Sequence, residues 1–122
     1  MNLKNLLATV AVCLGLFSSA SALAHTHLKT LVPAADSSVA PTNELRMSFS
    51  EALEVSVSQV QLLRVDGAAV GPVVLGLAED DNKTLLVKTA KPLAPGEYQV
   101  QWRVVSKDTH TVKGTYRFNV RQ

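Results

Sequence analysis

The side chains that could bind a metal ion are few, and they fall in two short stretches of the sequence. His25 and His27 lie in "AHTH", whereas His110 lies in "SKDTHTVKG", two residues after Asp108. Imidazole nitrogens and carboxylate oxygens are common ligands of divalent metal ions. The question is whether both stretches bind the same ion.

The role of His25 depends on where the mature chain begins. Residues 1–24 carry one cation, Lys4, then an apolar run from Leu6 to Phe17 and the small-residue tail "SSASALA". This order is typical of a secretory signal peptide, and the apolar run is too short to span a bilayer. We expect cleavage after Ala24, so that residues 25–122 form one mature domain and His25 carries a free α-amine.

A free amine makes His25 a chelating residue. Its amine and its imidazole can close a ring on one metal ion, and both donors are neutral nitrogen atoms. If the stretch around Asp108 and His110 is extended, their side chains face the same side and add an oxygen and a third nitrogen. Nitrogen and oxygen donors in a tetragonal arrangement favour Cu(II). The residues therefore predict a Cu(II) site.

Other interpretations of these residues remain open. His27, at the third position of the mature chain, could bind Cu(II) or Ni(II) with the terminal amine and the intervening backbone amides. A strand that begins near Leu28 would make this geometry hard to reach, so we favour the first arrangement and keep His27 as an extra ligand or a supporting hydrogen-bond donor. Without a metal, Asp108 would be a turn residue and the histidines at positions 25 and 27 a disordered tail.

The elements that must position these residues are predicted to be strands. Runs of alternating apolar and polar residues are separated by turn residues, which predicts an all-β antiparallel sandwich of immunoglobulin type with about seven strands. Tyr98, just after "APG", is where a tyrosine corner would lie. Trp102 and Met47 are expected to face the core. The predicted strands are residues 28–32, 44–50, 58–65, 71–77, 83–89, 97–105 and 115–121.

Charge and cysteine content exclude several classes of function. Lys4 is the only lysine, arginine or acid before His25, so the mature chain carries 11 bases against 10 acids. This nearly neutral balance does not indicate binding to nucleic acid. We also expect no membrane insertion after cleavage. Cys13 is the only cysteine and is removed with the signal peptide. The mature domain therefore has no disulfide and no thiolate ligand.

The motifs together resemble those of the CopC family of periplasmic copper-resistance proteins. The resemblance covers essentially the whole mature length, and the combination of motifs is specific. The matching stretches are the histidine after the signal peptide, "PAADSSVAP" at Pro33 to Pro41, "FSE" at Phe49 to Glu51, "LAPGEYQVQWRVVSKDTH" at Leu93 to His110, and "KGTYRF" at Lys113 to Phe118.

The resemblance implies a Greek-key β-sandwich that binds one Cu(II) ion per chain through His25, Asp108 and His110. It also implies a carrier or buffer in periplasmic copper resistance and homeostasis, not an enzyme, with a CopD-like inner-membrane copper transporter as partner. Some family members bind Cu(I) through a methionine-rich loop. Met47 is the only methionine of the mature chain, so we expect a Cu(II)-only type.

Two other functions are alternatives to a copper carrier or buffer. A copper monooxygenase-like enzyme could hold its metal with a similar histidine brace, but the few aromatic residues alternate into the core and leave no flat platform for a polymer. Asp108 would also occupy a position that O₂ activation needs open. A metal-free structural sandwich module is the other alternative, and it predicts a stability that does not change with copper.

Overall fold

The structure, a computed structural model, describes residues 26–122. Eight strands and one short 3₁₀ helix, η2 (Val55–Val57), follow one another along the chain. All seven predicted strands are present, so a chain that starts at His25 keeps every described element. The strands are β1 (Leu28–Val32), β2 (Ser38–Val39), β3 (Glu44–Phe49), β4 (Gln59–Arg64), β5 (Val73–Ala78), β6 (Asp81–Thr89), β7 (Gly96–Val105) and β8 (Thr111–Val120).

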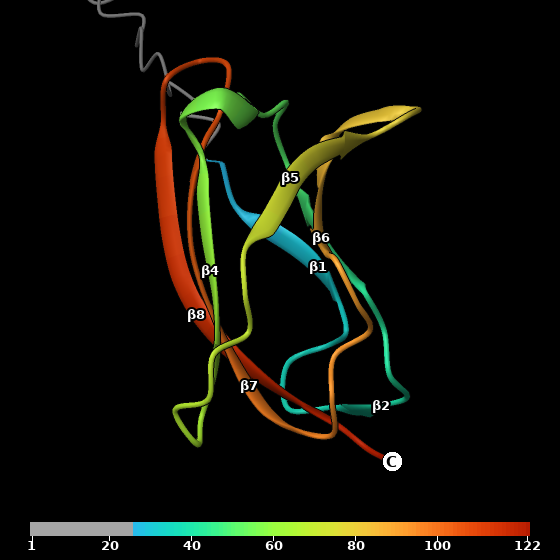
Figure 1. The fold of residues 1–122 in the computed structure, drawn as a ribbon. Helices are drawn as coiled ribbons and strands as arrows, with labels where there is room; N and C mark the ends of the chain where they lie inside the picture. Colours follow the sequence, from blue (N-terminus) through green and yellow to red (C-terminus); the bar gives the residue numbers. More distant parts are fainter. Residues whose placement is uncertain (1–25) are drawn as a thin grey trace, which may run out of the picture.

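The strands form two sheets that face each other (Figure 1). One sheet has the order β1-β3-β6-β5 and the other has the order β2-β8-β7-β4. Every pair of neighbouring strands is antiparallel except β2 and β8, which are parallel. The expected all-β sandwich is confirmed.

The core lies between the inner faces of the two sheets. Alternation along β7 places Tyr98, Val100, Trp102 and Val104 inside, because successive side chains of a strand point to opposite faces. Met47 on β3 is fully buried, and the Trp102 ring packs edge-on against Phe49 with 5.4 Å between ring centroids. The core positions predicted for Trp102 and Met47 are therefore confirmed.

The tyrosine corner is also confirmed. The Tyr98 hydroxyl group donates to the carbonyl oxygen of Ala94 at 2.6 Å and accepts a hydrogen bond from Arg64 Nη1 at 3.1 Å. Arg64 Nη2 donates to the carbonyl oxygen of Pro95 at 3.1 Å. These bonds tie the turn before β7 to the end of β4 and so fix where β7 begins.

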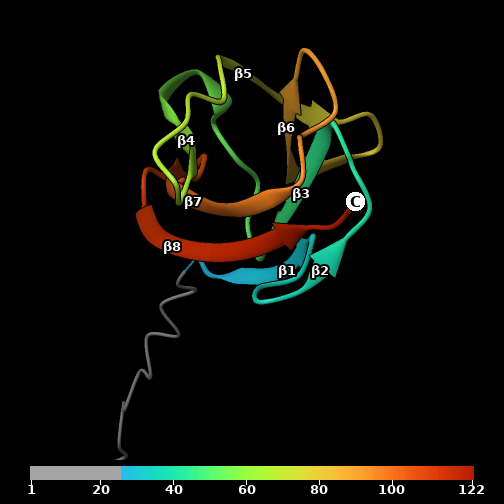
Figure 2. The same ribbon diagram turned by 60° about the horizontal axis from the view of Figure 1, so that its bottom comes forward.

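Two features differ from the prediction. The sequence predicts no strand between residues 32 and 44, but Ser38 and Val39 pair with Asn119 and Val120 and form β2 beside the end of β8 (Figure 2). In addition, β8 begins at Thr111, not at Thr115, because Thr111 to Gly114 pair with β7. The connection that carries the candidate ligands is therefore shorter than expected and spans only residues 106–110.

Candidate metal centre

The β7–β8 connection lies at one end of the sandwich, next to η2 and the start of β1 (Figure 1). The segment 50–54 joins these parts. Its first residue, Ser50, exchanges hydrogen bonds with the backbone of His27, and Ala52 accepts a 2.8 Å hydrogen bond from the Lys107 amide. Leu53 forms an isolated bridge with Ser106. The start of β1 and the connection with Asp108 and His110 are thus held to one short segment.

Asp108 and His110 lie side by side, as predicted. The Nδ1 atom of His110 is 3.0 Å from Oδ2 of Asp108, and about half of each side chain is exposed to solvent. The contact places a carboxylate oxygen and an imidazole nitrogen at neighbouring positions on the connection. Both are donor types that divalent metal ions accept.

The extended conformation from which this proximity was predicted is wrong. The connection is not extended: residues 107 and 108 form a turn, and Thr109 adopts a left-handed conformation with φ of 71°. The Thr109 amide donates to the carbonyl oxygen of Ser106 at 2.9 Å, and the Ser106 amide donates to the carbonyl oxygen of His110 at 2.9 Å. A tight turn therefore brings the two side chains together.

Ser106 contacts both candidate ligands of the connection, although no sequence motif pointed to it. Its side chain is buried, with 1% of the residue exposed, and its hydroxyl group donates to Oδ1 of Asp108. The Oγ atom of Ser106 also lies 3.2 Å from the carbonyl oxygen of His110. The sequence signal was a small hydroxylated residue two positions before Asp108, a spacing that allows the hydroxyl to reach the carboxylate only when the chain turns.

Hydrogen bonding also sets the charge of the carboxylate. The Ser106 hydroxyl lowers the pKa of Asp108 below its ordinary value, and hydrogen bonds from the side chain and backbone of His110 lower it further, against a smaller opposing effect of burial. Asp108 is therefore ionised at neutral pH. A charged carboxylate beside a correctly oriented imidazole is an oxygen and nitrogen pair that suits a divalent ion.

The backbone of His27 is bound to Ser50, the first residue of segment 50–54. Its backbone amide donates to the Ser50 hydroxyl at 2.9 Å, and its carbonyl oxygen accepts from the Ser50 amide at 2.9 Å. The structure therefore fixes the backbone of His27 immediately before β1. His25 lies outside the described residues.

Residues 26–122 contain neither a preformed cluster of metal-binding side chains nor a membrane-spanning helix. Within this range, no group of three or more histidine, cysteine, aspartate or glutamate side chains is placed to hold a metal ion. In the same part of the chain, no helix is long and apolar enough to cross a membrane.

Comparison with known proteins places the chain among relatives of similar length. It is 38% identical over 107 residues to copper resistance protein C of Escherichia coli, an alignment that covers 83% of this chain and 85% of that protein. It is 34% identical over 123 residues to copper resistance protein C of Xanthomonas campestris pv. juglandis, with 97% of each chain covered.

Solved structures agree with these relatives. The methionine-rich copper resistance protein PcoC of Escherichia coli superimposes with a TM-score of 0.71 and 36% identity, covering 80% of this chain and all of that one. CopC of Methylosinus trichosporium OB3b gives a TM-score of 0.68 and 30% identity, covering 79% of this chain and 93% of that one. The family model described as the CopC domain matches residues 28–121, and the chain therefore belongs to the CopC family.

Proposed function

We propose that this protein binds one Cu(II) ion in the bacterial periplasm and acts in copper resistance as a carrier or buffer. The observation that carries the proposal is the proximity of Asp108 and His110, whose Oδ2 and Nδ1 atoms are 3.0 Å apart. On binding, the metal ion would replace this contact and take one oxygen and one ring nitrogen from the pair. Membership of the CopC family supports copper as the cargo, because relatives of this chain are named copper resistance proteins.

The remaining ligands come from the N-terminus that cleavage after Ala24 would create. His25 is bonded to Thr26, which is buried and precedes the segment of the chain that Ser50 fixes. The amine and the imidazole of His25 would complete a set of three nitrogen atoms and one oxygen atom, which suits the tetragonal geometry of Cu(II). Cleavage would therefore create one of the four donor atoms, the amine nitrogen of His25.

The hydrogen bonds of His27 favour this arrangement over the competing one. Binding by the third residue of a free N-terminus needs the backbone amide nitrogen of that residue as a deprotonated ligand. In this protein that amide donates a 2.9 Å hydrogen bond to the Ser50 hydroxyl. The competing mode would break this bond and loosen the start of β1, so we assign His27 a supporting role.

The oxidation state follows from the ligands that the chain offers. Cu(I) prefers soft thioether and thiolate donors. Met47 is the only methionine after Met1, and it is fully buried between the sheets. PcoC, in contrast, is described as methionine rich. A site of imidazole, amine and carboxylate donors is suited to Cu(II), and a CopD-like inner-membrane protein is the partner that we expect to exchange copper with it.

A paired set of variants tests the proposal. We expect the double variant Asp108→Ala/His110→Ala, made in the chain that starts at His25, to lose Cu(II) affinity by at least about 100-fold, since removing a single supporting group of a metal site already costs about 10- to 100-fold. The measurement is competition against a chromophoric Cu(II) chelator. The control is Asp66→Ala/Lys88→Ala, which removes one acid and one base far from the site. Equal affinity of the two double variants would refute the proposal.

A further inference from the structure

The outer face of the sheet β2-β8-β7-β4 carries a hollow that the proposed copper ligands do not line. The hollow has a volume of about 800 Å³ and lies over β4, β7 and β8, and Val60, Trp102 and Gly114 form part of its lining. No acidic residue among the described residues lines it. The side chains that point outward around it are Gln59, Gln61, Gln101, Arg103, Lys113 and Thr115.

Two cations face each other across this hollow. Arg103 on β7 and Lys113 on β8 are directly opposite in the strand register, and both side chains are exposed. Among residues 26–122, neither forms an ion pair. Like charges that are directly opposite in an antiparallel pair are destabilising. The fold therefore keeps an unfavourable contact at this place.

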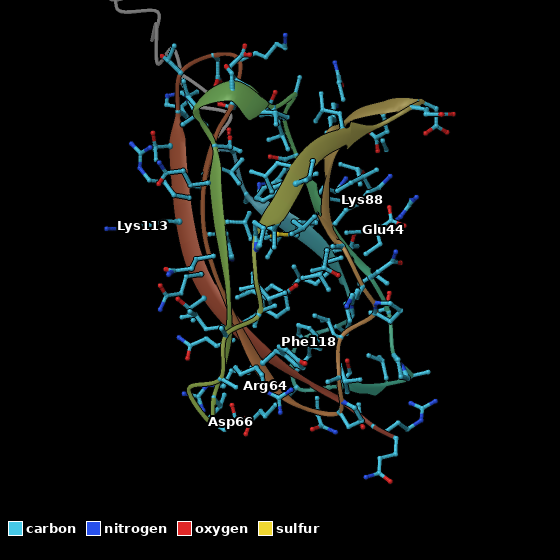
Figure 3. The ribbon with its side chains drawn as sticks, viewed as in Figure 1. Glu44, Arg64, Asp66, Lys88, Lys113 and Phe118 are labelled. Atoms are coloured by element: carbon cyan, nitrogen blue, oxygen red, sulfur yellow. The ribbon has the colours of Figure 1, made fainter. Side chains whose placement is uncertain are left out.

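The other sheet shows that the chain can balance such positions. On its outer face Glu44 of β3 is directly opposite Lys88 of β6, and Arg46 Nε lies 3.8 Å from Glu44 Oε1. Lys113 extends from β8 on the opposite side of the molecule from Glu44 and Lys88 (Figure 3). The face that carries Lys113 also pairs charges, since Arg117 Nη1 lies 3.8 Å from Glu97 Oε1. Arg103 and Lys113 stand out on it because neither forms an ion pair within the described residues.

Protection of a sheet edge does not explain the two cations. Lysine and arginine are often placed on edge strands, where they prevent pairing with another chain. However, β7 and β8 are the two interior strands of their sheet, since β2 and β4 form its edges. Solubility also does not require the two charges to be directly opposite each other.

We propose that this face is a docking surface for an acidic segment of a partner protein. Carboxylates of the segment would pair with Arg103 and Lys113, while the glutamine amides, which both donate and accept hydrogen bonds, would bind its backbone. An anionic membrane or a nucleic acid fits less well. Recognition of acidic lipids commonly uses clusters of about four to eight cations, whereas this hollow has two.

The surface lies next to the proposed copper ligands. Only two strand pairs, Val104–Val112 and Val105–Thr111, separate the Arg103–Lys113 pair from the β7–β8 connection. A partner docked on the hollow would therefore lie beside Asp108 and His110, in a position to receive or deliver copper. The link to copper transfer rests on the function proposed above, whereas the docking surface itself does not.

A peptide titration followed by NMR tests the surface. The probe is a capped six-residue peptide of alternating glycine and glutamate, added at low salt to the ¹⁵N-labelled chain that starts at His25. We expect saturable shifts confined to residues 59–61, 101–103 and 113–115. The same peptide with glutamine in place of glutamate should produce none. The variant Arg103→Gln/Lys113→Gln should weaken binding by about tenfold, corresponding to two exposed ion pairs.

Matched controls separate the possible outcomes. Arg46→Gln/Lys88→Gln removes the same charge from the other sheet and should leave peptide binding unchanged. If the two double variants lose binding equally, or if the shifts spread over both faces, the docking surface is refuted. Binding to phosphatidylglycerol vesicles without any response to the peptide would identify a lipid surface instead and would also overturn the proposal.

Copper affinity is measured on the same samples. We expect Arg103→Gln/Lys113→Gln to bind Cu(II) like the unmodified chain. If the unmodified chain binds no copper but still shows the peptide shifts, the function proposed above fails and the docking surface stands. If copper binds and the peptide shifts nothing, the docking surface fails alone.

Discussion

The Ser106 hydroxyl group, at the start of the β7–β8 connection, donates to the Asp108 carboxylate, and its oxygen lies 3.2 Å from the carbonyl oxygen of His110. It therefore contacts both residues that we assign as copper ligands on this connection. A hydroxyl in this position does not need to touch the metal ion to affect its binding. It orients the carboxylate and keeps it ionised.

Replacing Ser106 should lower the affinity for Cu(II). We expect Ser106→Ala to reduce Cu(II) affinity by about 10- to 100-fold, the range typical of groups that support metal ligands. The EPR spectrum of bound Cu(II) should change as well, because the carboxylate is no longer held in one orientation. Competition titration and EPR on the chain from His25 provide the measurement.

Ser58 offers the matched control for this prediction. It is also a buried serine, whose hydroxyl donates to the carbonyl oxygen of Glu54 at 2.8 Å and accepts from the Val105 amide at 3.0 Å. Ser58→Ala removes comparable hydrogen bonds without touching Asp108. The assignment of Ser106 would be wrong if the two variants lowered copper affinity to the same extent.

At the scale of elements, the pairing of β7 with β8 depends on a glycine. Gly114 is directly opposite Trp102, and a Cβ atom on Gly114 would lie 2.6 Å from Cζ2 and 2.9 Å from Cε2 of the indole ring. The ring therefore lies over the glycine and covers its backbone. Through this contact the Trp102 side chain packs in the core against β8.

Filling this contact should destabilise the sandwich. We expect Gly114→Ala to lower the free energy of unfolding by about 1–3 kcal/mol, the usual cost of overpacking a core. Gly76→Ala in β5 is the control, because a Cβ atom there meets nothing within 4 Å; this change should be neutral or slightly stabilising. Urea unfolding followed by tryptophan fluorescence measures both, and equal effects would contradict the packing described.

How much of the fold could be predicted differs between elements. Strands such as β7 and β3 were predictable because one face is buried, so that apolar and polar residues alternate. β2 was not, since two residues cannot show a period and pair only because the chain returns to β8. The start of β8 was not predicted because Gly114 interrupts the apolar face near its beginning. Alternation identifies buried faces, but not strand ends stabilised by backbone pairing alone.

The candidate site shows a similar division. The pairing of Asp108 with His110 was predictable from their spacing, whereas the turn at Thr109 and the contact with Ser106 were not, because they depend on backbone conformation. The opposition of Arg103 and Lys113 was also invisible in the sequence. It depends on the register of β7 with β8, which the length of the connection sets.

For the whole molecule, stability should fall in alkali because of one buried phenol. Burial raises the pKa of Tyr116 to about 12, whereas a tyrosine in an unfolded chain titrates near about 10. Between these values the unfolded chain loses the proton that the folded chain keeps, so stability is fully present below about pH 10 and is lost as the pH rises toward 12. At about pH 11 the loss from this group is roughly 1 kcal/mol.

Tyr116→Phe isolates this contribution from those of the other titrating groups. The Tyr116 hydroxyl is buried and has no hydrogen-bond partner within residues 26–122, so the substitution should not destabilise the protein at neutral pH. We expect urea unfolding at about pH 8 and about pH 11 to show a smaller alkaline loss in the variant than in the unmodified protein. Identical losses in the two proteins would show that the phenol keeps an ordinary pKa.

The most direct test of copper binding concerns the start of the mature chain. Two proteins are compared by Cu(II) competition titration: the chain that starts at His25, and the same chain with one extra residue before it. If the free amine of His25 is a ligand, the extension should weaken binding by orders of magnitude, because it converts the amine into a peptide nitrogen. Equal affinity would contradict the proposed site and would return His25 and His27 to the role of an ordinary N-terminal tail.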